Sequence, residues 1–194
     1  MSRAERDKWD ARYRAGAYAE RAHPTALLAD WLDRLPKGRA LDVACGAGRN
    51  ALFLAAAGYA VDAVDISAAG IERGRATAAE RGVEVGWQCV DLEERPDALP
   101  RGPYDLVVWV RYVNAALWPV VISRLAPGGH VLVEQHLVTS ADVVGPTSAA
   151  FRLAPGDLAR AARNLETVYA HEGLVVDPDG RSAALAQLIA RRTS

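Results

Sequence analysis

The sequence predicts an α/β fold in which helices cover both faces of a doubly wound, mostly parallel sheet. From residue 39 onward, short apolar runs alternate with helical runs, which is typical of parallel sheets joined by crossover helices. The glycine-rich turn Gly46-Ala47-Gly48 directly follows the first apolar run, and Asp65 and Asp91 end the next two. Because ligands bind beyond the carboxyl ends of the strands in such sheets, the same residues predict a binding site.

The bulk composition predicts a globular protein and argues against several classes of function. Of the 194 residues, 51% are hydrophobic and 24% are charged. The formal net charge of −1 at pH 7 provides no overall attraction to nucleic acids or anionic membranes. The charged N-terminus does not resemble a secretion signal, no apolar run is long enough to span a membrane, and no His or Cys cluster has metal-site spacing. We expect a cytoplasmic protein without metal, nucleic-acid or membrane partners, and the oligomeric state stays open.

The length is that of one domain, and changes in the pattern of residue types along the chain divide it into four parts. Residues 1–38 are expected to form helices over the site, and residues 39–137 to form the ligand-binding core. Residues 138–156 are expected to form a substrate loop, and residues 157–194 a C-terminal helix and hairpin.

Two amphipathic helices are expected before the sheet. Trp9 and Tyr13 are four residues apart in a charged segment, so both rings lie on one helical face. A second apolar stripe starts after Pro24 and stops at Pro36, which cannot continue a helix.

Caps and turn residues delimit the elements of the core. Gly58 lies where a helix terminator belongs, Ser67 can cap the next helix, and Pro127-Gly128-Gly129 stops another. The expected strands are residues 40–43, 59–64, 83–90, 106–110 and 130–133, and the expected helices are residues 50–57, 67–82 and 115–125.

The C-terminal part is expected to be a loop, a short helix and two strands. Residues 139–156 mix small residues with prolines, as in long functional loops. A short helix is expected to end near residue 163. Strands are expected at 166–171 and 183–190, on either side of Asp177-Pro178-Asp179-Gly180, which is a hairpin signal. This last pair must therefore be at least partly antiparallel.

The turn and the acidic strand ends predict a nucleoside site. Gly46 and Gly48 allow the backbone to approach a ligand closely, since a Cβ would collide or strain the turn. Asp65 lies 17 residues past Gly48, about where a carboxylate accepts hydrogen bonds from a ribose diol. Asp91 is placed to accept from the exocyclic amine of adenine.

Asp42 helps to choose among nucleosides. It lies inside the first expected strand, four residues before Gly46. A nicotinamide dinucleotide places its pyrophosphate at this turn and gains nothing from a nearby negative charge. A ligand with an ammonium group and a sulfonium does gain, so Asp42 favours S-adenosylmethionine. A nicotinamide-dependent oxidoreductase and a non-catalytic cofactor-binding module stay open as alternatives.

Successive motifs of the chain resemble those of class I S-adenosylmethionine-dependent methyltransferases. These motifs are LDVACGAGRN, VDAVDIS, VDLEE, YDLVVWVRYV and LAPGGHVLVEQ. Within that superfamily the chain is similar to small bacterial enzymes of the tellurite-resistance and thiopurine methyltransferase-like type, through DKWDARY, a later HP, and the pairing of GRN with RYV. The resemblance implies a Rossmann-like, seven-stranded sheet whose last strand is inserted antiparallel. Ala44 stands where the superfamily usually has its first glycine.

Candidate cofactor-binding residues come from the turn, the strand ends and the first helix. They are Asp42, Ala44, Gly46, Gly48, Asn50, Asp65, Ile66, Asp91, Leu92, Val110, Trp9 and Tyr13. The rings of Trp9, Tyr13 and Tyr112 are suited to contact a sulfonium, although core packing explains Trp9 equally well.

Arg111 and His136 are the candidate catalytic residues. Methyl transfer requires mainly that the acceptor be aligned with the methyl group, and a base is needed only where the acceptor must lose a proton. Arg111 can steer an anionic acceptor or form a salt bridge to Asp42 or another acid. His136 can act as the base or anchor a loop, and it shares a strand face with Glu134 if the fifth strand extends that far.

Residues after the fourth strand narrow the acceptor. Positions 110–113 lack the Asn/Asp-Pro-Pro-aromatic run of enzymes that methylate nucleobase amines, and Arg111 would repel the divalent cation of catechol methyltransferases. We therefore expect a small-molecule acceptor, anionic or with a soft acceptor atom. Its identity and the methylated atom stay open.

Overall fold

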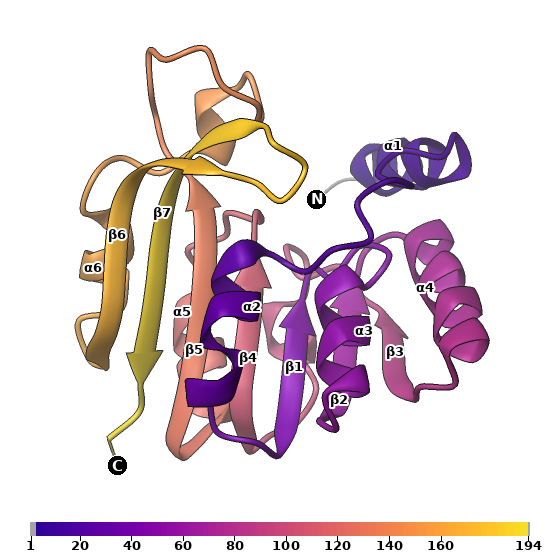
Figure 1. Cartoon of the computed structure of the whole chain (residues 1–194), viewed down its shortest axis with the longest axis horizontal. Coiled ribbons are helices and arrows are strands. Elements are labelled where there is room, and N and C mark those ends of the chain that lie inside the picture. The colour runs from indigo at the N-terminus through magenta and orange to yellow at the C-terminus, as the bar shows by residue number, and fades with distance from the viewer. Residues whose placement is uncertain (1–2, 194) are drawn as a thin grey trace.

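The protein is built around a seven-stranded sheet (Figure 1). The computed structural model describes residues 3–193. Positions 1, 2 and 194 of the expected ranges lie outside the described residues. The strand order is β3-β2-β1-β4-β5-β7-β6, with β1 to β5 parallel and β7 inserted antiparallel between β5 and β6. The expected Rossmann-like sheet with its antiparallel C-terminal hairpin is confirmed. The strands are β1 (Arg39–Val43), β2 (Ala60–Asp65), β3 (Val85–Cys89), β4 (Tyr104–Val110), β5 (Leu125–His136), β6 (Glu166–Val176) and β7 (Ser182–Arg191).

Helices cover both faces of this sheet. They are α1 (Arg3–Arg14), α2 (Ala26–Trp31), α3 (Arg49–Ala56), α4 (Ala68–Arg81), α5 (Leu117–Arg124) and α6 (Asp157–Ala161), with short 3-10 turns η1 (Leu32–Arg34), η2 (Pro96–Ala98) and η3 (Ala149–Phe151). Among the helices of residues 3–193, none is both long and apolar enough to cross a membrane.

Side chains of the central strands alternate between two hydrophobic clusters. Leu41 packs in the cluster that includes Leu117 of α5, whereas Ala40 packs in the cluster that includes Leu28 of α2 and Leu54 of α3. Successive residues of a strand point to opposite faces, so both faces of a strand covered by helices must be apolar. This explains the nearly continuous apolar runs of the core.

Some boundaries differ from the expected ones. β5 begins at Leu125 instead of residue 130, because Leu125 already pairs with Tyr104 and a register shift absorbs the glycine-containing segment that follows. β6 extends to Val176 instead of residue 171, because its pairing with β7 continues to the hairpin. The second helix ends at Trp31 and continues as the turn η1.

Helix α1 lies at the end of the sheet to which β1 and β5 point, together with the 138–156 loop and the β6–β7 turn (Figure 1). The buried Asp10 fixes it there: its Oδ1 accepts from Ser67 Oγ at 2.6 Å and from the backbone N–H of Ala69 at 3.0 Å. Ser67 Oγ in turn accepts from Gly70 N, as an N-cap of α4 should. Asp10 therefore joins α1 to the first turn of α4.

The segment before α2 is tied to the sheet through Thr25. Its backbone N–H donates to Asn50 Oδ1 at 2.9 Å, and its hydroxyl donates to Glu134 Oε2 at 2.8 Å. Both contacts are buried, so this segment has a fixed path across the carboxyl ends of β1 and β5.

Trp87 of β3 packs against two glycines, and its ring occupies the space that a Cβ would need. A Cβ at Gly74 of α4 would lie 2.6 Å from the Trp87 ring, and one at Gly48 would also collide with it.

We expect Gly74→Ala to destabilise the protein by about 1–3 kcal/mol through overpacking, although alanine favours a helix by about 1 kcal/mol over glycine. Urea denaturation measures this, and the penalty should shrink in a Trp87→Leu background. A Gly74→Ala protein as stable as the parent would contradict the packing argument.

Candidate functional site

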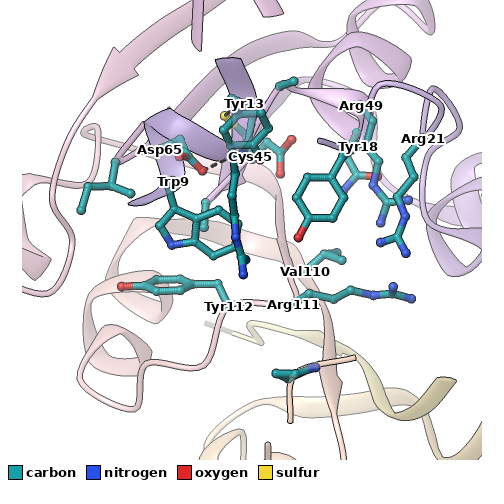
Figure 2. Close-up of a pocket in the computed structure, with 18 of the residues that line it drawn as sticks. Trp9, Tyr13, Tyr18, Arg21, Cys45, Arg49, Asp65, Val110, Arg111 and Tyr112 are labelled. Atoms are coloured by element: carbon teal, nitrogen blue, oxygen red, sulfur yellow. Dashed lines mark hydrogen bonds between the residues drawn. The ribbon is translucent and has the colours of Figure 1, made fainter. Parts of the chain in front are cut away.

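A cavity of about 1060 Å³ lies over the carboxyl ends of β1, β2 and β4, with walls from α1 and from the 138–156 loop. Figure 2 shows aromatic, acidic and arginine side chains converging on it. The predicted site residues in its wall are Trp9, Tyr13, Asp42, Ala44, Gly46, Asn50, Asp65, Ile66, Asp91, Leu92, Val110, Arg111 and His136. The structure thus brings together residues that the sequence spreads over more than a hundred positions.

Gly48 is the predicted site residue that does not line the cavity. Its φ of 78° is left-handed, and the Trp87 ring occupies the space that a Cβ would need. Gly46 also has a left-handed φ, of 60°, and the space beside it is filled by the Tyr13 hydroxyl. Backbone conformation and packing of aromatic side chains therefore explain both glycines, and of the two only Gly46 lines the cavity.

Backbone strain is concentrated at the cavity. In residues 3–193, the non-glycine residues with positive φ are Tyr18 (61°), Ala44 (54°) and Arg111 (58°), and all of them line it. Such conformations persist where the surrounding structure enforces them, commonly at functional sites. The left-handed φ of Ala44 also explains why glycine is usual at this position in the superfamily that the chain resembles.

Asp42 is a buried carboxylate in the cavity wall at the end of β1. Its Oδ2 accepts from the backbone N–H of Ala51 at 3.0 Å. Burial raises the pKa of Asp42 to about 7, against the lowering effects of this hydrogen bond and of Arg49. A cation placed beside it would therefore favour the ionised form.

Asp65 organises the turn while it faces the cavity. Its Oδ2 accepts from Gly46 N at 2.7 Å and its Oδ1 from Ser67 N at 2.8 Å. Burial raises the pKa of Asp65 despite these hydrogen bonds. A carboxylate has about four acceptor positions, so capacity for ligand hydroxyls is left.

Asp91 combines a capping role with exposure to the cavity. Its Oδ1 accepts from Glu93 N at 3.0 Å, and its Oδ2 lies 3.9 Å from Arg6 Nη2. Like Asp65, it therefore holds the turn that follows its strand.

Arg111 is paired with acids, although not with Asp42. Its Nε donates to Glu134 Oε1 at 3.3 Å and its Nη2 to Asp177 Oδ1 at 2.5 Å. Burial would lower the pKa of Arg111, but the hydrogen bonds and charges of Asp177 and Glu134 raise it overall. The side chain joins β4, β5 and the β6–β7 turn, and its charge is compensated within the protein.

His136 is buried in the cavity wall at the end of β5. Burial, followed by the charges of Arg111 and Arg152, lowers the pKa of His136 to about 4, so the imidazole is neutral at pH 7. Its Nδ1 is buried and has no hydrogen-bond partner among residues 3–193. Its carbonyl accepts from Leu153 N at 2.8 Å, which anchors the 138–156 loop. The base and anchor interpretations of His136 are therefore compatible.

The cavity also contains residues that we did not identify from the sequence. Tyr18, Arg21, Arg49 and residues 144–148 of the loop line it. Arg49 stands directly after Gly48 within the motif LDVACGAGRN, and this position could have identified it as a cavity residue. Nothing in the local pattern around Arg21 distinguishes it from the other arginines of the chain.

Comparison with known proteins agrees with this geometry. Residues 40–129 match the model of the methyltransferase domain family. This part of the chain, somewhat less than half of it, is therefore similar to a methyltransferase domain. The resemblance found in the sequence motifs is confirmed.

The curated relatives share part of their length with this chain. A ubiquinone biosynthesis O-methyltransferase of Caulobacter sp. (strain K31) is 35% identical over 100 residues, which cover 49% of this chain and 39% of the relative. A ribosomal protein L11 methyltransferase of Bordetella parapertussis is 34% identical over 139 residues, covering 69% of this chain and 43% of the relative. The chain thus spans about two fifths of the length of these relatives.

The fold is also found in solved structures. The crystal structure of TehB from Haemophilus influenzae aligns with a TM-score of 0.72 at 22% identity, covering 85% of this chain and 61% of that one. Likeness at this identity establishes the fold.

Removal of Arg111 should leave two buried carboxylates without their counter-charge. We expect Arg111→Gln to destabilise the protein by about 3–5 kcal/mol, the usual cost of breaking a buried ion pair from one side. Arg111→Lys should recover part of this loss because it retains one charge. Urea denaturation measures both, with the exposed Arg163→Gln as a control that should lie near the parent. Equal stability of Arg111→Gln and Arg163→Gln would show that the ion pairs contribute little.

Proposed function

We propose that the protein is an S-adenosylmethionine-dependent methyltransferase that acts on a small-molecule acceptor. The observation that carries the proposal is the row of carboxylates Asp42, Asp65 and Asp91, which lie at or just beyond the carboxyl ends of adjacent parallel strands and line one cavity. The family match of residues 40–129 supports the same activity and the same cofactor.

The residues of the cavity fit this cofactor. Asp65 has acceptor capacity for a ribose diol, and Asp91, with the apolar Ile66 and Leu92 beside it, suits an adenine. Asp42 is buried, accepts a single hydrogen bond from within residues 3–193 and forms no ion pair there, so an ammonium group would supply a directly contacting counter-charge. The faces of Trp9 and Tyr13 favour a sulfonium. Asn50, Ala44 and Val110 complete the wall near the turn.

When bound, S-adenosylmethionine supplies a methyl group already activated for displacement by its sulfonium. The protein then has to hold the acceptor in line with that methyl group, an effect worth up to about 7–11 kcal/mol in favourable cases. Helix α1 and the 138–156 loop form walls of the cavity in which this alignment would take place.

His136 and Arg111 take different roles in this proposal. Neutral His136 can take a proton from the methyl acceptor, but its low pKa makes it a weak base. A weak base suits methyl acceptors that need little deprotonation. Arg111 holds the β6–β7 turn beside the cavity, and its charge contributes to keeping His136 neutral.

Alternatives differ in what they predict. The name of the Bordetella relative indicates a protein acceptor for that enzyme, whereas a cavity walled by α1 and a loop supports a small molecule here. A nicotinamide-dependent oxidoreductase would bind NADH, and a non-catalytic module would bind the cofactor without turnover. The cytoplasmic location and the lack of nucleic-acid and membrane partners remain predictions from composition.

Calorimetry with S-adenosylmethionine and S-adenosylhomocysteine tests the proposal directly. We expect both to bind, and Asp65→Ala to weaken binding by about 1–3 kcal/mol, the scale for a lost hydrogen bond to a charged group. The exposed Glu80→Ala of α4 serves as the control. Absence of binding at about millimolar ligand would refute the cofactor assignment, and unchanged affinity in Asp65→Ala would refute the ribose contact.

Binding should also depend on pH through Asp42. Because the pKa of the free protein's Asp42 is about 7 and the ionised form favours an ammonium group, affinity for S-adenosylhomocysteine should rise with pH. Between pH 6 and pH 8 the gain should be about tenfold, with uptake of the ligand releasing a proton at pH 6. Titrations in buffers of different ionisation enthalpy detect that proton. In Asp42→Asn the dependence should be lost; a parent protein with pH-independent affinity would show that Asp42 does not face the ammonium group.

A further inference from the structure

The face of the sheet that carries α5 is only partly covered. The other parallel crossovers each contain a helix, α3, α4 or α5, whereas the crossover from β3 to β4 contains only the 3-10 turn η2 (Figure 1). Helices α3 and α4 pack in the cluster on the opposite face, so residues 90–103 alone cross this side of β2 and β3. Asp62 and Gln88 lie on the uncovered face, because one precedes Val64 of the α5 cluster by two residues and the other pairs with it.

A second cavity, of about 830 Å³, lies at this place, and we call it the crossover groove. It has no lining residue in common with the cavity over the carboxyl ends of the strands. Its wall contains Arg39 at the start of β1, Arg124 at the end of α5 and residues 97–101 of the crossover, together with Asp62 and Gln88. The proposed methyl transfer assigns no role to this groove.

The carboxylate of Asp62 is already neutralised by the protein. Its Oδ2 accepts from Arg39 Nη2 at 3.1 Å and from Tyr104 Oη at 2.7 Å. The Arg39 guanidinium also lies over the Tyr104 ring, 4.7 Å from the ring centroid. Burial and the hydrogen bond to Asp62 raise the pKa of Tyr104, so its hydroxyl remains a donor at neutral pH. Arg39 and Asp62 therefore leave little charge for a ligand.

Arg101 and Arg124 are not compensated in this way. The exposed guanidinium of Arg101 forms neither a hydrogen bond nor an ion pair within residues 3–193. Arg124 donates from Nη2 to the carbonyl of Asp97 at 3.3 Å, while its Nε is buried and has no partner in the same range. Because buried N–H groups are nearly always hydrogen-bonded, this Nε indicates a missing ligand or water. Among the described lining residues, two guanidinium groups thus face one remaining carboxylate, that of Asp97.

The two arginines start from neighbouring backbone. Arg101 is followed by Gly102, which packs so closely against Arg124 that a Cβ would collide with the Arg124 carbonyl oxygen. The hydrogen bond from Arg124 to Asp97 fixes the same crossover segment a few residues earlier. Two planar forks of N–H donors therefore line one groove, and the exposed amide of Gln88 lies in the same wall.

We propose that Arg101 and Arg124 bind the phosphate group of a small molecule in the crossover groove. A phosphate group has several strong acceptor oxygens and up to two negative charges, so it accepts hydrogen bonds from both forks and offsets their charge. It also supplies a partner for Arg124 Nε. The groove is larger than a phosphate ion, so it has room for the organic part of a phosphate ester. No cluster of three or more potential ligands for a metal ion is found within residues 3–193, which argues against a metal site here.

Calorimetry with three probes tests the site and separates free phosphate from a phosphate ester. The probes are sodium phosphate, ribose 5-phosphate and, as the uncharged match of the ester, ribose. The titrations use the parent, Arg101→Gln and Arg124→Gln in a buffer free of phosphate and sulfate, at a pH where phosphate is mainly doubly charged.

Two control variants show where a phosphate binds. Arg163→Gln removes an exposed arginine that does not line the groove. Arg49→Gln removes a guanidinium of the other cavity that forms no ion pair within residues 3–193. Thermal unfolding checks that every variant is folded.

The parent should bind phosphate or ribose 5-phosphate but not ribose. Arg101→Gln should weaken this binding about 10-fold or more, the scale for hydrogen bonds to a charged group, and Arg101→Lys should retain part of it. Because Arg101 has no partner to lose within residues 3–193, its variants should unfold at the parent's temperature. They provide the comparison alone if Arg124→Gln does not fold. Tighter binding of ribose 5-phosphate than of phosphate identifies an ester as the ligand, and equal affinities identify recognition of the phosphate group alone.

The site is refuted if the parent binds neither charged probe at about millimolar concentration. It is also refuted if Arg101→Gln and Arg124→Gln bind these probes as tightly as Arg163→Gln does. A loss of affinity confined to Arg49→Gln has the same meaning, because the phosphate then occupies the other cavity. None of these outcomes depends on methyl transfer, so the site and the proposed function are tested separately.

Discussion

The buried carboxylate of Glu134 joins more parts of this molecule than any other interaction described above. It accepts hydrogen bonds from Thr25 Oγ1 at 2.8 Å and Gln187 Nε2 at 2.9 Å, and it pairs with Arg111 at 3.3 Å. Arg111 then reaches Asp177 in the β6–β7 turn. A charge with 1% exposure is tolerated only when its lone pairs are satisfied, and these partners satisfy it from the segment before α2, from β7 and from the residue after β4. The walls of the cavity are thereby held in one arrangement.

The chemistry of the cavity follows from strand direction. Parallel strands end at the same edge, so side chains at the ends of β1 and β2, and just beyond β3, face one space although they are far apart in sequence. Acids at those positions also hold the turns that follow them, as Asp65 does for Gly46. The carboxylates that hold these turns are therefore the same ones that we propose to bind the cofactor, so a substitution at Asp65 would affect the turn as well as the proposed contact.

Sequence patterns predicted the features that depend on neighbouring residues. Strand ends, the cap at Ser67 and the hairpin turn are local, and local patterns were enough to place Asp42, Asp65 and Asp91 at one edge. The partners of Arg111 were not predictable in this way, since Asp177 is 66 residues away and a salt bridge leaves no periodic signal. The same applies to Gly46 and Gly48, whose neighbours Tyr13 and Trp87 come from other elements.

Arg49 illustrates a different limit. The position of Arg49 beside Gly48 was visible in the sequence. That its guanidinium has no ion-pair partner within the described residues is visible only in the three-dimensional arrangement. Residue type and spacing tell where a charge is, whereas compensation by Glu134, Asp177 and Asp179 decides which charges are available to a ligand.

The connections of Glu134 have a consequence for folding order. Thr25 is 109 residues before it and Gln187 is 53 residues after it, so the cluster needs both early and late parts of the chain. During synthesis the first five strands can assemble before β7 emerges, but Glu134 would then be buried without one of its donors. Contacts of such long sequence separation close late and slow the approach to the native state. The cavity is therefore completed only when the final hairpin docks, so partly made chains carry the glycine turn without the wall that the hairpin supplies.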